Sequence, residues 1–144
     1  MLKIGVIGSG AWATTIAKIS SENGHDTTLI THSEKYVECI NKHHENSFRL
    51  KGIPLPISLK AITTESFNSH ECDALILSVP SIYIPSLEAF LKKIEKTTPL
   101  LILTKGLMSE EIPFVSDYLK VHFGFEKIAV LSGPNLALEI ANGL

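Results

Sequence analysis

The apolar residues of this chain fall into six short runs, each bounded by polar or glycine-rich segments. The runs are rich in apolar or β-branched side chains and lie at residues 4–7, 27–31, 59–63, 73–79, 100–104 and 128–131. Each run predicts a β-strand. The near-continuous apolar character of 73–79 and 100–104 is typical of central parallel strands that are covered on both faces.

Between these runs, apolar residues recur at helical spacing. We expect helices from Ala11 onward, over residues 33–41, along a stripe from 84 to 94, and over 115–124. The buried face expected for the fourth helix consists of Val115, Tyr118, Leu119 and His122. Alternating strands and helices indicate an α/β fold: a doubly wound parallel sheet of the Rossmann type, in one domain that spans residues 1–144.

Two segments depart from this alternation. Residues 42–56 contain two prolines and no clear period, so we expect an irregular excursion there. Residues 132–135 follow the last strand, and we expect them to open a final helix with Pro134 in its first turn.

A glycine turn joins the first strand to the first helix. Gly8, Ser9 and Gly10 follow the strand directly, and Ala13 takes the place of a third glycine. Gly8 permits a sharp turn, while Gly10 lets the backbone approach a pyrophosphate at the start of the helix. This order of strand, turn and helix predicts a dinucleotide-binding site, although a glycine turn with a purely structural role is the alternative.

The end of the second strand bears on the choice of cofactor. A carboxylate there usually binds the ribose of NAD, but this chain has Thr31 and His32, with Lys35 close behind. The sequence therefore predicts NAD or NADP as the cofactor, with NADPH slightly favoured. His32 as an ordinary solvated loop residue is the alternative.

In a parallel sheet, ligands bind beyond the carboxyl ends of the strands. Lys105 follows a central strand and precedes a glycine, so it is placed to meet an anionic or carbonyl-bearing substrate. If residues 132–135 open a helix, their unpaired N–H groups and a short polar side chain could also bind a polar ligand. The alternatives are that Lys105 is a surface lysine without a function and that residues 132–135 are an ordinary helix start.

Composition narrows the class of protein. The 144 residues include 13 basic and 15 acidic side chains, for a net charge of −2, so we expect no nucleic-acid partner. No apolar run is long enough to span a bilayer and no signal peptide precedes the first strand, so a cytoplasmic location is expected. Cys39 and Cys72 lack metal-binding or disulfide spacing, and no metal site is expected.

Five motifs in register resemble NAD(P)-dependent glycerol-3-phosphate dehydrogenase over essentially the whole chain: residues 8–14, 46–56, 73–81, 104–107 and 131–137. The resemblance implies that the cofactor contacts are Gly8, Ser9, Gly10, Ala11, Trp12, His32, Lys105 and Ala137. It implies that Lys105, Gly133 and Asn135 contact the substrate. Ala11, Ala13, His32 and Asn135 depart from the residues most frequent in the family, and His32 leaves the NADP preference open.

The resemblance also implies a reaction: hydride transfer between NAD(P)H and dihydroxyacetone phosphate, giving sn-glycerol 3-phosphate for glycerophospholipid synthesis. Family members continue into a helical second domain that supplies a proton-transferring lysine and a phosphate-binding arginine. We expect that domain to be absent from this chain, which then contains no catalytic residue. A homodimer is expected for the full-length enzyme. The alternatives are another two-domain NAD(P) reductase of a small keto substrate and a non-catalytic NAD(P)-sensing module.

Overall fold

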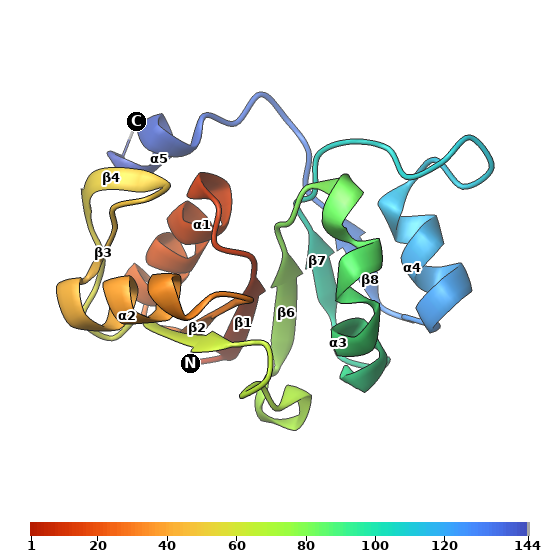
Figure 1. Cartoon of the computed structure of the whole chain (residues 1–144), viewed down its shortest axis with the longest axis horizontal. Helices are drawn as coiled ribbons and strands as arrows, with labels where there is room; N and C mark the ends of the chain where they lie inside the picture. Colours follow the sequence, from red (N-terminus) through yellow and green to blue (C-terminus); the bar gives the residue numbers. More distant parts are fainter. Residues whose placement is uncertain (144) are drawn as a thin grey trace.

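A six-stranded parallel sheet forms the centre of the molecule. The computed structural model describes residues 1–143. All five strand pairings are parallel. From edge to edge, the strands are β5 (Lys60–Thr63), β2 (Asp26–Thr31), β1 (Lys3–Ile7), β6 (Ala74–Leu77), β7 (Leu100–Ile102) and β8 (Ile128–Val130) (Figure 1). The six predicted strands and the doubly wound order are therefore confirmed. The strand order reverses between β1 and β6.

Five helices connect or follow these strands: α1 (Ala11–Glu22), α2 (Glu34–His43), α3 (Glu88–Lys93), α4 (Val115–Phe123) and α5 (Ala137–Ala141). Short 3-10 turns lie at η1 (Ser69–Glu71), η2 (Ser81–Tyr83) and η3 (Pro85–Leu87). The apolar stripe expected from 84 to 94 is buried apart from Leu87, which is half-buried, but its first turn is η3, so the α-helix itself begins at Glu88. Within residues 1–143, no helix has the length and apolarity that crossing a membrane requires.

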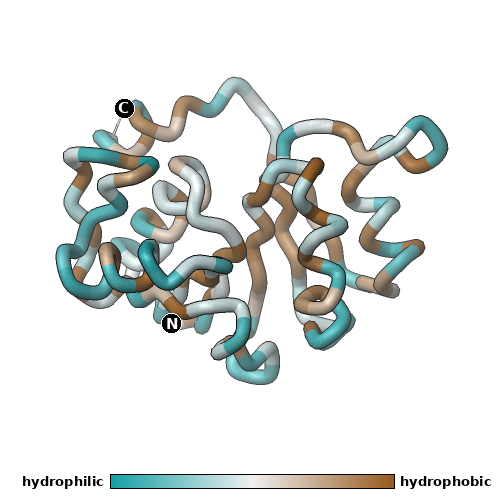
Figure 2. The backbone as a smooth tube through the Cα atoms, in the orientation of Figure 1, coloured by the Kyte–Doolittle hydropathy of each residue, from teal (hydrophilic) through white to brown (hydrophobic). Residues whose placement is uncertain are grey.

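Alternating residues of the central strands divide the core into two layers. Val6, Leu29 and Ile76 pack with residues of α1 and α2, while their neighbours Ile7 and Ile30 pack with residues of α3 and α4. Successive side chains of a strand point to opposite faces, so the helices cover both sides of the sheet. The central strands are accordingly the most apolar part of the tube in Figure 2.

The excursion expected to be irregular contains a small antiparallel hairpin. Its strands are β3 (Glu45–Asn46) and β4 (Leu50–Pro54). Leu50 and Ile53 of the hairpin are buried against Ala141 of α5 and Ala11 of α1. The C-terminal segment returns across the carboxyl ends of the strands to place α5 beside the hairpin (Figure 1). Contacts with residues distant in sequence thus order this segment, although its own apolar residues follow no helix or strand period.

Two expectations about helices are wrong. Residues 132–135 do not open a helix, because the Asn135 N–H donates to the Gly133 carbonyl over 2.9 Å and Leu136 is extended; α5 begins at Ala137. His122 is exposed rather than buried. The centres of its ring and the Tyr118 ring are 4.3 Å apart, and Val115 and Leu119 are the buried residues of α4. The reason is that α4 covers the edge of the sheet, where β8 is itself largely exposed.

Candidate functional site

The site lies where the strand order reverses, at the carboxyl ends of β1 and β6. Gly8 directly follows β1 and has a φ of +125°, a region that residues with a side chain rarely adopt. A Cβ at this position would lie 2.4 Å from the carbonyl oxygen of Ser78, which follows β6. The turn thus requires glycine at position 8 for close approach of two strands, apart from any ligand.

Gly10 has a different reason to be glycine. Its φ of −69° suits any residue, and a Cβ there would meet no atom within 4 Å. No side chain caps α1 and its first turn has no acidic residue. The first N–H groups of a helix lack intrahelical partners, so they and the positive dipole end are available to an anion. Open space beside an uncapped twelve-residue helix fits the pyrophosphate of a dinucleotide.

Buried hydrogen bonds hold this turn in place. Asn46 is fully buried, and its side-chain amide donates to the Ser9 carbonyl over 3.0 Å and to the Thr14 hydroxyl over 2.8 Å. The Thr14 hydroxyl donates in turn to the Gly10 carbonyl over 3.0 Å. From the other side, the Thr31 hydroxyl donates to that of Ser9 over 2.9 Å. The hairpin and β2 therefore fix the backbone around Gly10 before any ligand arrives.

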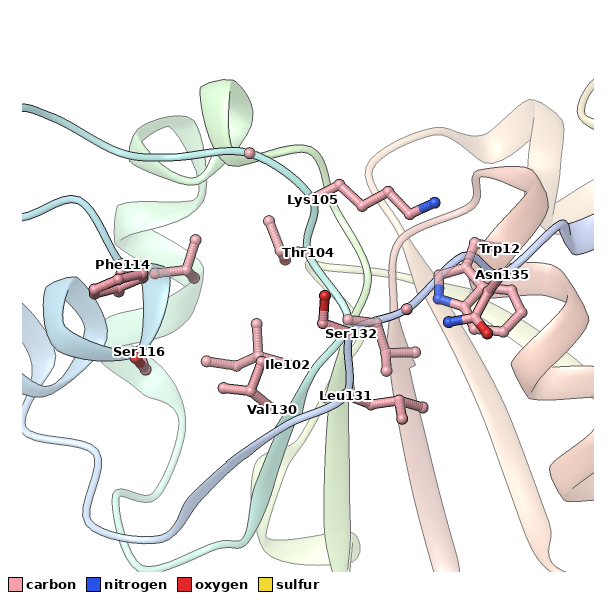
Figure 3. A pocket seen from close by; sticks show the side chains of 14 residues that line it. Trp12, Ile102, Thr104, Lys105, Phe114, Ser116, Val130, Leu131, Ser132 and Asn135 are labelled. Carbon is pink, nitrogen blue, oxygen red and sulfur yellow. The ribbon is translucent and has the colours of Figure 1, made fainter.

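A cavity of about 450 Å³ opens next to the turn. Four residues predicted from sequence line it together: Trp12, Lys105, Gly133 and Asn135. The Lys105 side chain extends toward the side where Trp12 and Asn135 lie, while Phe114 is on the opposite side (Figure 3). The expected convergence of strand ends on one rim is thereby confirmed for these four residues.

The position of Lys105 is set by the residue after it. Gly106 has a φ of +105°, and a Cβ there would lie 2.5 Å from the Ser81 hydroxyl. The Ser81 N–H donates to the Lys105 carbonyl over 3.4 Å. These contacts tie the loop after β7 to the loop after β6. The exposed Lys105 amine makes no hydrogen bond or ion pair to the described residues, so it is available to a ligand in the cavity.

Other predicted residues lie outside the cavity. His32 is exposed at the end of β2, on the far side of the glycine turn from Lys105. Ala11 packs against the hairpin, and the Ala137 carbonyl accepts a hydrogen bond from the Thr15 hydroxyl of α1 over 3.1 Å. Ser33, the first residue of the helix expected over 33–41, is the N-cap residue of α2, and its side chain makes no capping hydrogen bond.

Comparison with known proteins decides the family. The family described as "NAD-dependent glycerol-3-phosphate dehydrogenase N-terminus" matches residues 3–144. The chain belongs to this family. It is 41% identical over 143 residues to the glycerol-3-phosphate dehydrogenase [NAD(P)+] of Corynebacterium diphtheriae, covering 97% of this chain and 43% of the relative. The corresponding protein of Maricaulis maris is 33% identical over 142 residues, covering 98% of this chain and 42% of that protein.

Solved structures agree with this assignment. The glycerol-3-phosphate dehydrogenase of Coxiella burnetii superposes with a TM-score of 0.86 at 25% identity, over 99% of this chain and 44% of that one. The enzyme from Saccharomyces cerevisiae gives a TM-score of 0.85 at 28% identity, over 98% of this chain and 44% of that one. This chain thus spans less than half the length of each of these four relatives.

Some residues that shape the glycine turn or the cavity were not predicted from the sequence. Asn46 lies in the 46–56 motif, but no role was predicted for it, because the sequence of an irregular polar segment does not indicate which atoms a single amide contacts. Thr104, Ser132 and Phe114 also line the cavity. Thr104 and Ser132 follow predicted strands and belong to segments that the sequence already associates with the site, residues 104–107 and 132–135. Phe114 follows no strand, and no local pattern marks it.

Proposed function

We propose that residues 1–144 form one dinucleotide-binding domain, the cofactor-binding part of an NAD(P)-dependent glycerol-3-phosphate dehydrogenase. The observation that carries the proposal is the open space at Gly10 in front of uncapped α1, next to a cavity that contains Lys105. The reaction would be hydride transfer between NAD(P)H and dihydroxyacetone phosphate, giving sn-glycerol 3-phosphate. The family assignment supports the reaction, and the geometry supports the binding.

Each residue has a definite task in this proposal. Gly8, Ser9 and Gly10, with the N–H groups of Ala11 and Trp12, would hold the pyrophosphate. His32 would lie toward the adenosine ribose, and Ala137 beside the cofactor. Lys105 would touch both the nicotinamide side of the cofactor and the substrate.

On the substrate side, Gly133 and Asn135 would contact sn-glycerol 3-phosphate. The Lys105 ammonium would orient the substrate and polarise its carbonyl oxygen, since a fixed cation stabilises negative charge that develops there. When bound, the nicotinamide supplies or accepts the hydride. The proton-transferring group is expected in a second domain, so the 144-residue chain should bind cofactor and turn over poorly.

The same proposal includes the setting of the enzyme. Cys39 and Cys72 are both unpaired, which suits a reducing cytoplasm. The substrate is a small phosphorylated ketone or alcohol, and the full-length enzyme is proposed to be a homodimer.

The sole tryptophan gives a direct test of cofactor binding, because Trp12 lines the cavity. Adding NADH or NADPH to the chain should quench Trp12 emission by energy transfer to the reduced nicotinamide, and ATP, which has no nicotinamide, should not reproduce that transfer. Absence of quenching by both reduced nucleotides, with the protein folded, would contradict the proposal.

The choice of substrate needs a complete enzyme. Joining this chain to the C-terminal part of the Corynebacterium diphtheriae relative gives a chimera in which turnover can be measured. We expect dihydroxyacetone phosphate to be reduced far faster than unphosphorylated dihydroxyacetone. Equal rates with the two ketones would favour a different keto substrate.

A further inference from the structure

A segment without regular secondary structure carries two of the residues assigned to the substrate. Residues 132–136, called the crossing segment below, run from β8 to α5 across the carboxyl ends of the strands (Figure 1). Gly133 and Asn135 of this segment line the cavity together with Lys105. Their positions therefore depend on the contacts that hold the crossing segment in place.

The crossing segment is attached to the fold at its two ends and not along its length. Within residues 1–143, residues 132–135 make no backbone hydrogen bond to another segment. Just before them, the Leu131 N–H donates to the Ile102 carbonyl of β7 over 2.9 Å. Just after the crossing segment, the Ala137 carbonyl accepts a hydrogen bond from the Thr15 hydroxyl of α1 over 3.1 Å. The second attachment thus joins α1 to a residue 122 positions away in the sequence.

Helix α5 does not fix this second end by itself. It has five residues, and a helix of that length is not stable without tertiary contacts. Ala141 is its buried residue, and it packs against Leu50 and Ile53 of the hairpin. That contact fixes the far end of α5. The Thr15 hydroxyl, bonded to Ala137, fixes the end that adjoins the crossing segment.

The place of Thr15 on α1 links the crossing segment to the cavity. Thr15 is fully buried, so surrounding atoms restrict the direction of its hydroxyl. Trp12 lies three residues earlier in the same helix, and residues at this spacing project from the same face. Trp12 lines the cavity on the side where Asn135 lies (Figure 3). One face of α1 therefore meets both the cavity and the end of the crossing segment.

We propose that Thr15 is a positioning residue for the substrate side of the site. Its hydroxyl holds the end of the crossing segment, so that Gly133 and Asn135 stay beside Lys105. This inference rests on the proposed function, in which those three residues contact the substrate. Thr15 does not line the cavity, so it acts through the crossing segment and not by touching a ligand. A small displacement of substrate-binding residues is enough to weaken a reaction that depends on close orientation.

The test compares two substitutions of Thr15 with a matched control. Thr15→Val keeps the shape of the side chain and removes the donor, whereas Thr15→Ser keeps the donor. Thr27→Val is the control, because Thr27 is also fully buried and its hydroxyl bonds that of Ser20 over 2.8 Å, near the amino end of β2. Circular dichroism checks that each variant is folded. If Thr15→Val does not fold, Thr15→Ala takes its place, since alanine has the higher helix propensity.

The first measurements use the 144-residue chain. NMR follows the exchange of two amide hydrogens at the end of α5, those of Ile140 and Asn142, which are both hydrogen-bonded. Thr15→Val should speed this exchange by about three- to tenfold, the factor expected from the net contribution of one hydrogen bond. It should also make Trp12 more accessible to quenching by acrylamide. Thr15→Ser and Thr27→Val should match the wild type in both measurements.

The second measurement uses the chimera with the C-terminal part of the Corynebacterium diphtheriae relative. Thr15→Val should raise KM for dihydroxyacetone phosphate by about three- to tenfold and leave KM for NADH and NADPH within about twofold. Thr15→Ser should restore the wild-type KM, and Thr27→Val should not change it. A purely structural role of Thr15 predicts a different result, because loss of folded enzyme lowers the apparent kcat and leaves both KM values unchanged.

Unchanged exchange of the α5 amides in Thr15→Val would overturn the inference, as would an unchanged KM for dihydroxyacetone phosphate. A parallel rise of KM for the ketone and for the nucleotide would also overturn it, because Thr15 would then support α1 as a whole. No reduction of dihydroxyacetone phosphate by the wild-type chimera would instead contradict the proposed function. In that case the exchange and quenching measurements would still decide whether Thr15 holds the crossing segment.

Discussion

The side-chain amide of Asn46 donates to the carbonyl oxygen of Ser9 over 3.0 Å, across 37 positions of sequence. This bond joins the hairpin to the glycine turn, and Asn46 is fully buried where it does so. Its second donor bond, to Thr14, reaches the first turns of α1. The hairpin therefore helps to shape the anion-binding turn, even though it lies outside the main sheet.

Removing this amide should destabilise the fold. Asn46→Ala leaves the buried Ser9 carbonyl and Thr14 hydroxyl without their donor, which we expect to lower the free energy of unfolding by about 2–4 kcal/mol. Urea unfolding followed by circular dichroism measures the change. Asn23→Ala is the matched control: Asn23 is exposed and also donates to a carbonyl, so its loss should cost about 0.5 kcal/mol. Similar costs for the two variants would contradict the role given to Asn46.

Gly8 should tolerate no side chain. Gly8→Ala introduces a Cβ 2.4 Å from the Ser78 carbonyl oxygen at a φ of +125°, and we expect it to lower stability by about 3 kcal/mol or more. Gly24→Ala separates the two causes, because Gly24 has a φ of +82° but open space around its Cβ. That variant should cost only about 1 kcal/mol, the strain alone. Unfolding curves in urea compare the two, and equal losses would refute the close approach of β1 to β6.

Replacing Lys105 should lower the rate of the reaction and leave the stability of the fold unchanged. Its amine is exposed and unbonded among residues 1–143, so Lys105→Gln should change the free energy of unfolding by less than about 0.5 kcal/mol. In the chimera with the Corynebacterium diphtheriae relative, the same change should lower kcat/KM for dihydroxyacetone phosphate by about a hundredfold. Lys120→Gln removes an equal charge from α4 and should leave kcat/KM unchanged. An unaltered kcat/KM in Lys105→Gln would remove Lys105 from the substrate site.

Cys72 gives the fold a pH dependence in the alkaline range. Burial raises the pKa of its thiol, and the charges of Glu71 and Asp73 raise it further. Because the folded pKa lies above the unfolded one, the neutral thiol stabilises the fold below the ordinary thiol pKa. That contribution is lost as pH rises through the raised value.

Two measurements check this prediction. Alkylation of Cys72 by iodoacetamide, followed by mass spectrometry, should reach half its maximal rate at a higher pH than for an unfolded cysteine peptide. The wild-type chain should also lose more stability than Cys72→Ala between neutral and strongly alkaline pH. A midpoint at or below that of the peptide would contradict the effect of burial.

The main sheet was predictable because its signal is local. Each strand is a short run of apolar or β-branched residues, and the runs at 73–79 and 100–104 owe their continuous apolarity to burial on both faces. The crevice followed from the parallel order, since carboxyl ends of parallel strands meet at one edge. Lys105 was found in this way, from its place after a strand, whereas Trp12 was implied by the family resemblance.

The missed features depend on distant partners. The β3–β4 hairpin is ordered by Ala11 and Ala141, which no window of sequence around 42–56 contains. The start of α5 was misplaced because a turn between Gly133 and Asn135 competes with the helix that Pro134 favours. The hydrogen bond from Arg49 to the Tyr36 hydroxyl was not foreseen, because the two residues belong to different elements.

Calorimetric titration of NADPH and NADH into the wild-type chain and Gly10→Ser tests the central claim most directly. Serine suits the N-cap position and φ of residue 10, so the variant should fold with unchanged or slightly higher stability. Its side chain would enter the open space in front of α1, and we expect both nucleotides to bind at least about tenfold more weakly than to the wild type. Equal affinities in the two proteins, or no binding by the folded wild-type chain, would contradict the assignment of this turn as the dinucleotide site.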